Sequence, residues 1–513
     1  MLLDDTEIGV IDTPKTETQT PRLKVGFVSL GCPKNLVDSE VMMGLLDQAG
    51  AQMTTSPEAA DILVVNTCSF IDTAKQESVD TILEMAQHKT TGKAQKLIVA
   101  GCLVERYRNE IQKNIPEVDA VVGTGELEKI LEAAGLDAPV APAVQPVSPF
   151  NILTGVSIGV SAGGVSARAE GDLREAQGRF ARKEWGGAEA ALPQYLYDHT
   201  TPRLLATRGP SAYIKIAEGC DHPCSFCVIP NLRGKFRSRH FESVVAEAER
   251  LVAQGVQEIT LIGQDTTCYG EDLGLKDGLA TLLDELAGIE GLRWLRFLYA
   301  YPNKITGRLL ETIAKHENIC KYLDVPLQHA SGPVLKSMKR GANADIFLKT
   351  IEKVRAAVPG IALRTSFIVG FPGETDTDFE TLSNFVREAR FDWLGVFGYS
   401  DEEGSGAFSL DEKVPTKVID QRKRALMRLQ KGLSKKAKQQ WIGRTMNVLV
   451  EGESAETPLL WEGRSQFHAP EIDGTVYIND FGPLESVVPG RFYECEITEA
   501  HDYDVVARVL SEA

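Results

Sequence analysis

The chain carries the run Glu218-Gly219-Cys220-Asp221-His222-Pro223-Cys224-Ser225-Phe226-Cys227, in which three cysteines have the spacing C-x3-C-x2-C. Three thiolates on one short loop can bind three irons of a four-iron cluster and leave the fourth iron open to a small molecule. The alternative is a structural zinc site with His222 as fourth ligand, because such sites are closed by four ligands. Zinc sites usually have paired C-x2-C units, and this loop has only one, so the spacing favours iron and sulfur.

A second set of cysteines lies near the start of the chain. Apolar runs at 24–30, 61–66 and 96–100 alternate with helical stretches, which predicts a parallel sheet. Each predicted strand leads into a cysteine, in turn Cys32, Cys68 and Cys102. Ligands of open α/β sheets bind beyond the carboxyl ends of the strands, so we expect these thiols to converge on a second metal cluster. The alternative is three small buried residues, since free cysteines are often found in cores.

Composition narrows the class of protein. The 513 residues suggest three domains or more, and 43% hydrophobic and 25% charged residues are ordinary for a globular protein. A net charge of -17 argues against a surface that coats nucleic acid as a whole, although a local basic patch is compatible with it. No apolar stretch is long enough to span a membrane, and we expect a cytoplasmic protein with reduced cysteines.

The pattern predicts an α/β protein of several parts. Residues 1–22 read as a disordered tail, 23–138 as an open parallel sheet domain, and 139–200 as a flexible linker or insertion without metal-ligand spacing. Residues 201–440 hold six strand-like runs, at 212–216, 258–262, 294–298, 322–325, 362–369 and 393–397. With intervening helices they predict a partial (β/α)6 barrel, and the cysteine loop follows its first strand, on the face where barrel active sites lie.

The last part of the chain combines a basic helix with short strands. Residues 417–440 hold nine Lys or Arg against Asp420, and Leu426, Leu429, Leu433 and Ala437 fall at helical spacing. This predicts one packed face and one basic face, which is either simply solvated or a dock for RNA or a ribosomal surface. Residues 441–513 alternate in short runs and predict a small β barrel of the OB kind, either a packing module or an oligonucleotide binder.

Several motifs together resemble the radical S-adenosylmethionine (SAM) methylthiotransferases. They are SLGCPKNLVDSE at 29–40, GQDTT at 263–267, DVPLQH at 324–329 and GRS at 463–465, besides the two cysteine sets. The resemblance covers about residues 23–135 and 196–513, and implies an N-terminal cluster domain, a radical SAM barrel and a C-terminal TRAM domain. The insertion at 145–192 is longer than expected for the family.

The resemblance implies the chemistry and the cofactors. Two [4Fe-4S] clusters would be held by Cys220, Cys224 and Cys227, the catalytic set, and by Cys32, Cys68 and Cys102. SAM cleaved at the first cluster would give a radical that takes a hydrogen atom, and the second cluster would present the sulfur. Within this family, the motifs resemble those of the enzymes that add a methylthio group to the β-carbon of an aspartate in small-subunit ribosomal protein uS12. Such enzymes need an electron donor such as flavodoxin or ferredoxin.

Four further residues are candidates for SAM binding. Phe226 would pack on adenine or simply fill the core, and Gly370 lies in a glycine-rich turn that suits close approach to a ligand. Arg364 and Gln264 would bind the SAM carboxylate or ribose, or satisfy each other. His329 is expected to be structural. Cys268, Cys320 and Cys495 have no partner at metal spacing.

Two other functions remain open at this point. Transfer-RNA methylthiotransferases of the same family share the clusters, but usually carry Gln rather than Pro33-Lys34 after the first cysteine. In that reading the β barrel and the basic helix contact RNA. The third reading is a zinc-stabilised RNA-binding protein without enzyme activity.

Overall fold

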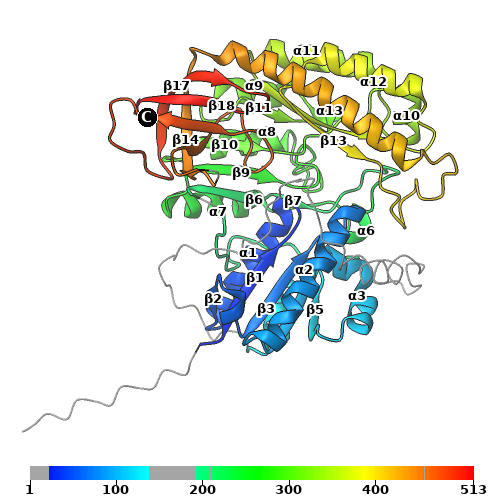
Figure 1. Cartoon of the computed structure of the whole chain (residues 1–513), viewed down its shortest axis with the longest axis vertical. Coiled ribbons are helices and arrows are strands. Elements are labelled where there is room, and N and C mark those ends of the chain that lie inside the picture. The colour runs from blue at the N-terminus through cyan, green and yellow to red at the C-terminus, as the bar shows by residue number, and fades with distance from the viewer. Residues whose placement is uncertain (1–21, 138–191, 208, 456) are drawn as a thin grey trace, which may run out of the picture.

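The computed structural model describes residues 22–137, 192–207, 209–455 and 457–513 (Figure 1). All of the predicted tail 1–22 except its last residue, and most of the predicted linker 139–200, therefore lie outside the described residues. The end of that predicted linker packs firmly: Tyr197 is 2% exposed, and its hydroxyl lies 3.2 Å from a carboxylate oxygen of Glu247. The described part forms an N-terminal domain, a central strand array with its helices, and a C-terminal β barrel beside that array (Figure 1).

The N-terminal domain is the predicted parallel sheet. Its strands run in the order β2 (Gln52–Thr54), β1 (Lys24–Ser29), β3 (Ile62–Thr67), β4 (Lys96–Gly101) and β5 (Ala120–Val122). Its helices are α1 (Pro33–Gln48), α2 (Asp72–Thr91), α3 (Cys102–Asn114) and α4 (Ile130–Ala134). Successive residues of β1 enter different cores, Phe27 on the side of α1 and Val28 on the side of α2 and α3. Both faces of the sheet are thus covered, as parallel sheets require.

The central domain contains all six predicted strands. They form two parallel sheets, β10 (Trp294–Phe297), β9 (Glu258–Ile262) and β6 (Ser211–Lys215), then β11 (Tyr322–Asp324), β12 (Ala362–Val369) and β13 (Trp393–Gly398). A bridge between Leu295 and Ile319 joins β10 to the segment before β11, so the six strands form one open array. The helices between the strands are α6 (Ile229–Arg233), α7 (Phe241–Ala253), α8 (Gly278–Leu286), α9 (Gly307–Lys315), α10 (Gly332–Ser337), α11 (Ala344–Ala357) and α12 (Asp376–Ala389). The prediction of a partial barrel is confirmed.

The basic helix α13 (Thr416–Lys438) packs through a face that is largely polar. Its buried residues follow each other at four-residue spacing: Arg422, Leu426, Gln430, Ser434 and Lys438. Leu429 and Leu433 are only half-buried, so the expected leucine stripe is only part of the packed face. Two of these polar side chains have close partners, because Arg422 pairs with Glu374 at 3.0 Å and the Lys438 ammonium lies 3.6 Å from the Trp393 ring centroid. Among the described residues, Gln430 Oε1 and Ser434 Oγ have no hydrogen-bond partner.

The C-terminal barrel is closed and has five strands. Its order is β14 (Thr445–Glu453), β15 (Trp461–Ser465), β16 (Val476–Asp480), β18 (Val505–Glu512) and β17 (Phe492–Ala500). Buried Arg464 on β15 donates to Glu258 of β9 at 2.7 Å, and Trp393 donates to the Phe467 carbonyl at 2.7 Å. These contacts fix the barrel against the central domain. Within the described residues, no helix has the length and apolarity needed to cross a membrane.

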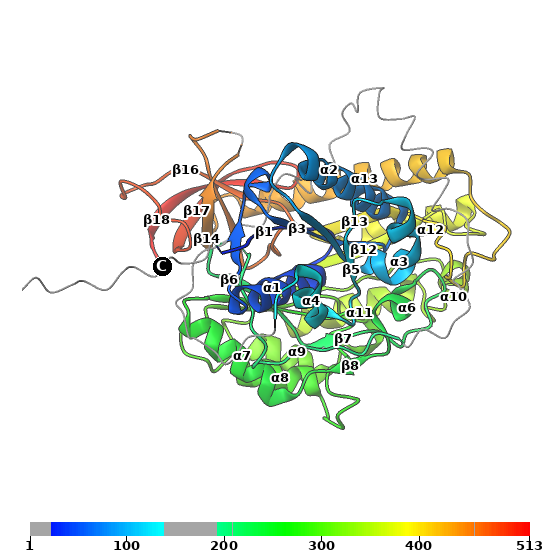
Figure 2. The ribbon, with the colours of Figure 1, turned by 90° about the horizontal axis from the view of Figure 1, so that it is seen from below.

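The N-terminal domain lies across the mouth of the central array (Figures 1 and 2). Helix α1 lies against β6, and α3 lies against the short helix α6 (Ile229–Arg233) that follows the cysteine loop. The carboxyl ends of both sets of strands therefore meet at one interface.

Candidate metal centre and cofactor site

The three N-terminal cysteines follow three neighbouring strands at the same level. Ser29 of β1 stands beside Asn66 of β3, and Asn66 beside Ala100 of β4. The residues that come next are the turns that carry Cys32, Cys68 and Cys102. Burial, together with the nearby Cys102 and Cys32 thiols, raises the pKa of Cys68 to about 12. The sheet register thus brings the three thiols together, as the strand pattern predicts.

Glycines make room for these turns. Gly31 has a φ of 89°, and a Cβ atom there would lie 2.7 Å from Cys68 Cβ and 3.0 Å from its Sγ. The side-chain amide of Asn35 then ties the turns together, because its Nδ2 donates to the Leu30 carbonyl at 2.7 Å and the Thr67 carbonyl at 3.2 Å. Only a residue without a side chain fits at Gly31 while Cys68 keeps its place.

The cysteine loop of the central domain is held by backbone bonds. The Cys220 N–H donates to the Gly234 carbonyl at 3.2 Å, and the Ser225 N–H to the Met338 carbonyl at 3.2 Å. Burial, followed by the charges of Cys224 and Cys220, raises the pKa of Cys227 to about 12. The three thiols are therefore close neighbours in a loop whose backbone is already fixed. A bound cation would favour the thiolate forms that burial opposes.

The spacing of the thiols fits clusters better than single ions. Two sulfurs bound to one zinc at about 2.3 Å can lie at most about 4.6 Å apart. Among the described residues, the group whose potential ligand atoms all lie within 4.8 Å of one another is His222, Asp265 and Cys268, and neither cysteine set is that compact. A cluster in which each thiolate binds its own iron suits this wider spacing.

His222 does not turn toward the cysteines as a fourth zinc ligand. Its Nε2 lies 2.6 Å from Asp265, and its ring stacks on Tyr301 with centroids 3.9 Å apart. Cys268 lies close by, with its Sγ 3.0 Å from the same carboxylate of Asp265. The fold thus groups Cys268 with His222 and Asp265, and the prediction that Cys268 is not a cluster ligand stays a prediction. Cys320 and Cys495 are buried in apolar surroundings.

A buried ionic network joins the two cysteine sets. Arg233, from α6, contacts Asp38 of α1 at 2.6 Å and Glu218, two residues before Cys220, at 3.3 Å. Lys215 of β6 contacts the same Asp38 and, at 2.6 Å, the same Glu218. Burial alone would raise the pKa of Glu218, but Lys215 and Arg233 hold it at about 2. Glu218 is therefore ionised at neutral pH, and its buried contacts with Lys215 and Arg233 fix the network in place.

Direct packing supports the same junction. Cys102 forms a small apolar cluster with Val228, which follows Cys227, and with Leu232 of α6. The Arg233 guanidinium also acts on the Cys102 thiol, whose pKa is raised to about 11 by burial and pulled down in part by that positive charge. Each domain thus contributes one side of the junction.

Two of the predicted SAM residues have polar partners, but not each other. Gln264 donates to Glu218 at 2.6 Å, while its buried Oε1 has no hydrogen-bond partner among the described residues. Arg364 contacts Asp324 at 2.9 Å and Asp473 at 3.5 Å, so two carboxylates already meet its charge. Gln264 therefore keeps a polar atom for a ligand, and Arg364 does not keep an unpaired charge.

The other two predicted SAM residues are placed by packing. Phe226 is half-buried against the main apolar core. Gly370 has a φ of 78°, and a Cβ there would lie 2.3 Å from the Ile419 side chain of α13. Its N–H donates to Glu374 at 2.5 Å. Close helix packing is thus a sufficient reason for this glycine, and its contact with SAM stays a prediction.

Arg340 lies in none of the sequence motifs, whereas Lys34 lies in the motif at 29–40, which predicts no contact for it. The Arg340 Nη1 lies 3.6 Å from Cys224 Sγ, and its guanidinium lies 4.4 Å from the Tyr301 ring centroid. The Lys34 ammonium lies 3.3 Å from the ring centroid of Tyr299. Arg340 comes more than one hundred residues after the cysteine it contacts, so only the fold reveals the contact.

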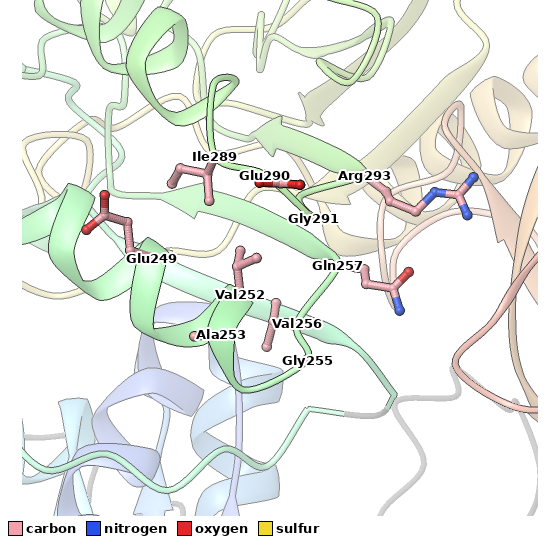
Figure 3. Close-up of a pocket in the computed structure, with 10 residues that line it drawn as sticks. All are labelled: Glu249, Val252, Ala253, Gly255, Val256, Gln257, Ile289, Glu290, Gly291 and Arg293. Carbon is pink, nitrogen blue, oxygen red and sulfur yellow. The ribbon is translucent and has the colours of Figure 1, made fainter.

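A surface hollow of the central domain lies elsewhere. Its lining comes from the end of α7 and from the segments that precede β9 and β10 (Figure 3): Glu249, Val252, Ala253, Gly255, Val256, Gln257, Ile289, Glu290, Gly291 and Arg293. These residues stand at the amino ends of the strands, whereas the cysteine loop follows a carboxyl end. The hollow is therefore on the face opposite to the candidate site.

Known sequence families match the three domains in turn. Residues 24–123 match the uncharacterized protein family UPF0004, residues 214–386 the Radical SAM superfamily, and residues 442–510 the TRAM domain. Among solved structures, the radical S-adenosylmethionine methyltransferase TsrM of Kitasatospora setae aligns with a TM-score of 0.47 and 15% identity, covering 74% of this chain and 72% of that one.

Curated relatives match almost the whole chain. The ribosomal protein uS12 methylthiotransferase RimO of Koribacter versatilis (strain Ellin345) is 68% identical over 504 residues, which are 98% of this chain and 99% of the relative. The RimO of Solibacter usitatus (strain Ellin6076) is 55% identical over 491 residues, which are 95% of each chain. The chain therefore belongs to the RimO family of radical SAM methylthiotransferases.

Proposed function

We propose that this chain adds a methylthio group to the β-carbon of an aspartate of ribosomal protein uS12, the protein named in its relatives. The observation that carries the proposal is the interface at which both cysteine sets open, joined by Arg233 through Asp38 and Glu218. A substrate carbon at this interface is within reach of both centres. One site is thus suited to remove a hydrogen atom and to deliver sulfur to the same carbon.

The reaction needs cofactors, because acids and bases do not replace an unactivated C–H bond by C–S. Enzymes of this family use SAM and [4Fe-4S] clusters, which supply an organic radical and the transferred sulfur when bound. We assign one cluster to Cys220, Cys224 and Cys227, and the other to Cys32, Cys68 and Cys102. The protein's own contribution is to hold the two sets at fixed separation and to keep water out through the buried network.

Arg340 and Gln264 are suited to bind SAM. Arg340 is a cation beside Cys224, and among the described residues it forms no ion pair with a carboxylate. It is therefore available for the α-carboxylate of SAM. The unpartnered Oε1 of Gln264 is an acceptor for an amino or ribose hydroxyl group. Phe226 and Gly370 remain candidates for the adenine end.

The basic face of α13 and the TRAM barrel are suited to contact RNA beside uS12. Seven exposed basic residues lie along the helix: Lys417, Lys423, Arg424, Arg428, Lys431, Lys435 and Lys436. Of these, Lys431 pairs with Asp502 of the barrel at 2.6 Å. We infer that whole small subunits, present in the cytoplasm, bind more tightly than isolated uS12 and that this gain falls with salt. The electron that SAM cleavage requires would come from a small redox protein such as flavodoxin or ferredoxin.

The experiment is intact-mass analysis of uS12 after anaerobic incubation with reconstituted enzyme, SAM, reductant and sulfide. Whole small subunits and unmodified transfer RNA are treated in parallel. A methylthio increment on an aspartate of uS12 is the expected result. Modified adenosine in transfer RNA, with unchanged uS12, would instead assign the chain to RNA modification.

A further inference from the structure

The Lys34 side chain is a buried cation without an acidic partner. Lys34 is 7% exposed, and its ammonium lies 3.3 Å from the centroid of the Tyr299 ring. Three other buried cations contact carboxylates: Lys215 with Glu218 at 2.6 Å, Arg233 with Asp38 at 2.6 Å, and Arg364 with Asp324 at 2.9 Å. Lys34, in contrast, forms no ion pair with any residue that the structure describes. The acidic groups of the chain that act on this ammonium are the Tyr299 hydroxyl and the Cys32 thiol, and no carboxylate of the described residues pairs with it. Buried charges are normally paired, so the ammonium is suited to a carboxylate that comes from outside the chain.

The position of Lys34 is between the two cysteine sets. It lies in the first turn of α1, two residues after Cys32, and reaches a residue of the other domain. That residue, Tyr299, lies two residues after the end of β10 and is held by two hydrogen bonds of its backbone. Its N–H donates to Asp324 at 3.0 Å, and its carbonyl accepts from the Thr266 N–H at 3.2 Å. The ammonium is therefore held at the contact between the N-terminal and the central domain.

The contact with Tyr299 leaves Lys34 able to bind a carboxylate. A ring face attracts an ammonium but carries no net charge, and an ammonium has three N–H donors. In aspartate the carboxyl carbon is bonded directly to the β-carbon. An enzyme that grips this carboxylate thereby places the β-carbon within one bond of a fixed point.

We propose that Lys34 binds the side-chain carboxylate of the substrate aspartate, and so selects an acidic residue and positions its β-carbon between the two centres. The inference rests on the proposed function, because it takes uS12 as the substrate. Lys34 is thus a specificity residue, whereas the cysteines hold the groups that react. Tyr299 acts through Lys34 as its positioning residue.

The test is binding, measured without turnover. Reconstituted enzyme with SAM but no reductant is titrated into fluorescently labelled uS12, and the anisotropy gives Kd. The enzymes are the parent, Lys34→Met, Lys34→Arg and the control Lys89→Met, whose lysine pairs with Asp119 at the far end of α2. The substrates are uS12 and uS12 with the target aspartate changed to asparagine.

Loss of a buried charge partner weakens binding by about thirtyfold or more. We therefore expect Lys34→Met to raise Kd by that factor for uS12 and to leave Kd for the asparagine form unchanged. Lys34→Arg keeps the charge and should recover part of the affinity. Lys89→Met should match the parent with both substrates. In a double-mutant cycle, Lys34→Met in the enzyme and the aspartate-to-asparagine change in uS12 are then coupled. A lysine with a purely structural role would give no such coupling.

Equal weakening of both substrates by Lys34→Met would overturn the proposal, as would loss of iron from the N-terminal set. Either result would make Lys34 a support for the cluster fold rather than a substrate contact. The same titrations separate this inference from the function. If the parent enzyme fails to modify uS12, the proposed function fails, and the coupling measured in Kd still decides the role of Lys34.

Discussion

The Nη1 atom of Arg233 lies 2.6 Å from Oδ2 of Asp38, so a cation from the helix after Cys227 pairs with an anion on the helix after Cys32. Each side chain is 2% exposed. The same guanidinium contacts Glu218, which precedes Cys220 by two residues. One buried charge thus sets the placement of both cysteine sets, and a change there acts on both at once.

Replacing Arg233 by methionine leaves Asp38 and Glu218 buried with Lys215 as their remaining basic partner. Breaking a buried ion pair from one side costs about 3–5 kcal/mol. We expect that loss in the free energy of unfolding, measured by urea denaturation of the reconstituted protein under anaerobic conditions. The control is Arg491→Met, which removes an exposed pair with Glu512 and should cost less than about 1 kcal/mol. Similar losses for both variants would contradict the role given to the network.

Removing one ligand from each cysteine set should separate the two centres. Cys224→Ala is expected to lower iron from about eight to about four atoms per chain and to abolish SAM cleavage. Cys68→Ala should lose a similar amount of iron but still cleave SAM, without transferring a methylthio group. Iron analysis and chromatography of the SAM products measure both effects. Cys495→Ala, in the distant β barrel, should keep the parent values, and full SAM cleavage by Cys224→Ala would refute the assignment.

Glu374 gives stability a pH dependence. Burial raises its pKa from 4.5 to about 7, although Arg422 and the N–H groups of Gly370 and Phe371 oppose the shift. A carboxyl group whose pKa is raised by folding stabilises the fold fully below pH 4.5, and this contribution is lost as pH rises to about 7. Relative to Glu374→Gln, the parent should therefore lose about 3 kcal/mol of unfolding free energy across this window. Urea denaturation at several pH values checks it, and a difference that does not vary with pH would exclude the shift.

The sequence predicts those parts of the site that depend on local pattern. Alternating strands and helices place Cys32, Cys68 and Cys102 at one sheet edge, because parallel strands in register end at the same level. The loop from Cys220 to Cys227 is likewise visible as spacing alone. Both predictions rest on short-range order, which the residues themselves encode.

Contacts between domains cannot be predicted from local sequence patterns. Asp38 and Arg233 are 195 residues apart, and each taken alone reads as an ordinary exposed charge. The polar packed face of α13 has the same origin, since the Gln430 side-chain amide donates from Nε2 to the Phe391 carbonyl at 2.9 Å. The alternation of apolar and polar residues does not predict strand β15, because Gly463 interrupts it. The fold needs a glycine there, since a Cβ would lie 2.6 Å from the Leu449 carbonyl oxygen.

Gly31 and Gly50 form a matched pair for testing the N-terminal centre. Their φ values are 89° and 90°, so alanine at either position costs about 1–2 kcal/mol of backbone strain. The surroundings differ, because a Cβ at Gly31 would lie 2.7 Å from Cys68 Cβ, whereas a Cβ at Gly50 meets no atom within 4 Å. Gly50→Ala should therefore lose stability but retain all its iron. Gly31→Ala should lose the iron of the N-terminal set and the transfer of sulfur, while SAM cleavage persists. Iron content after reconstitution distinguishes the two outcomes. Equal iron in the two variants would mean that Cys68 can move away from the added methyl group, and that the turn at Gly31 does not fix the position of the N-terminal cysteines.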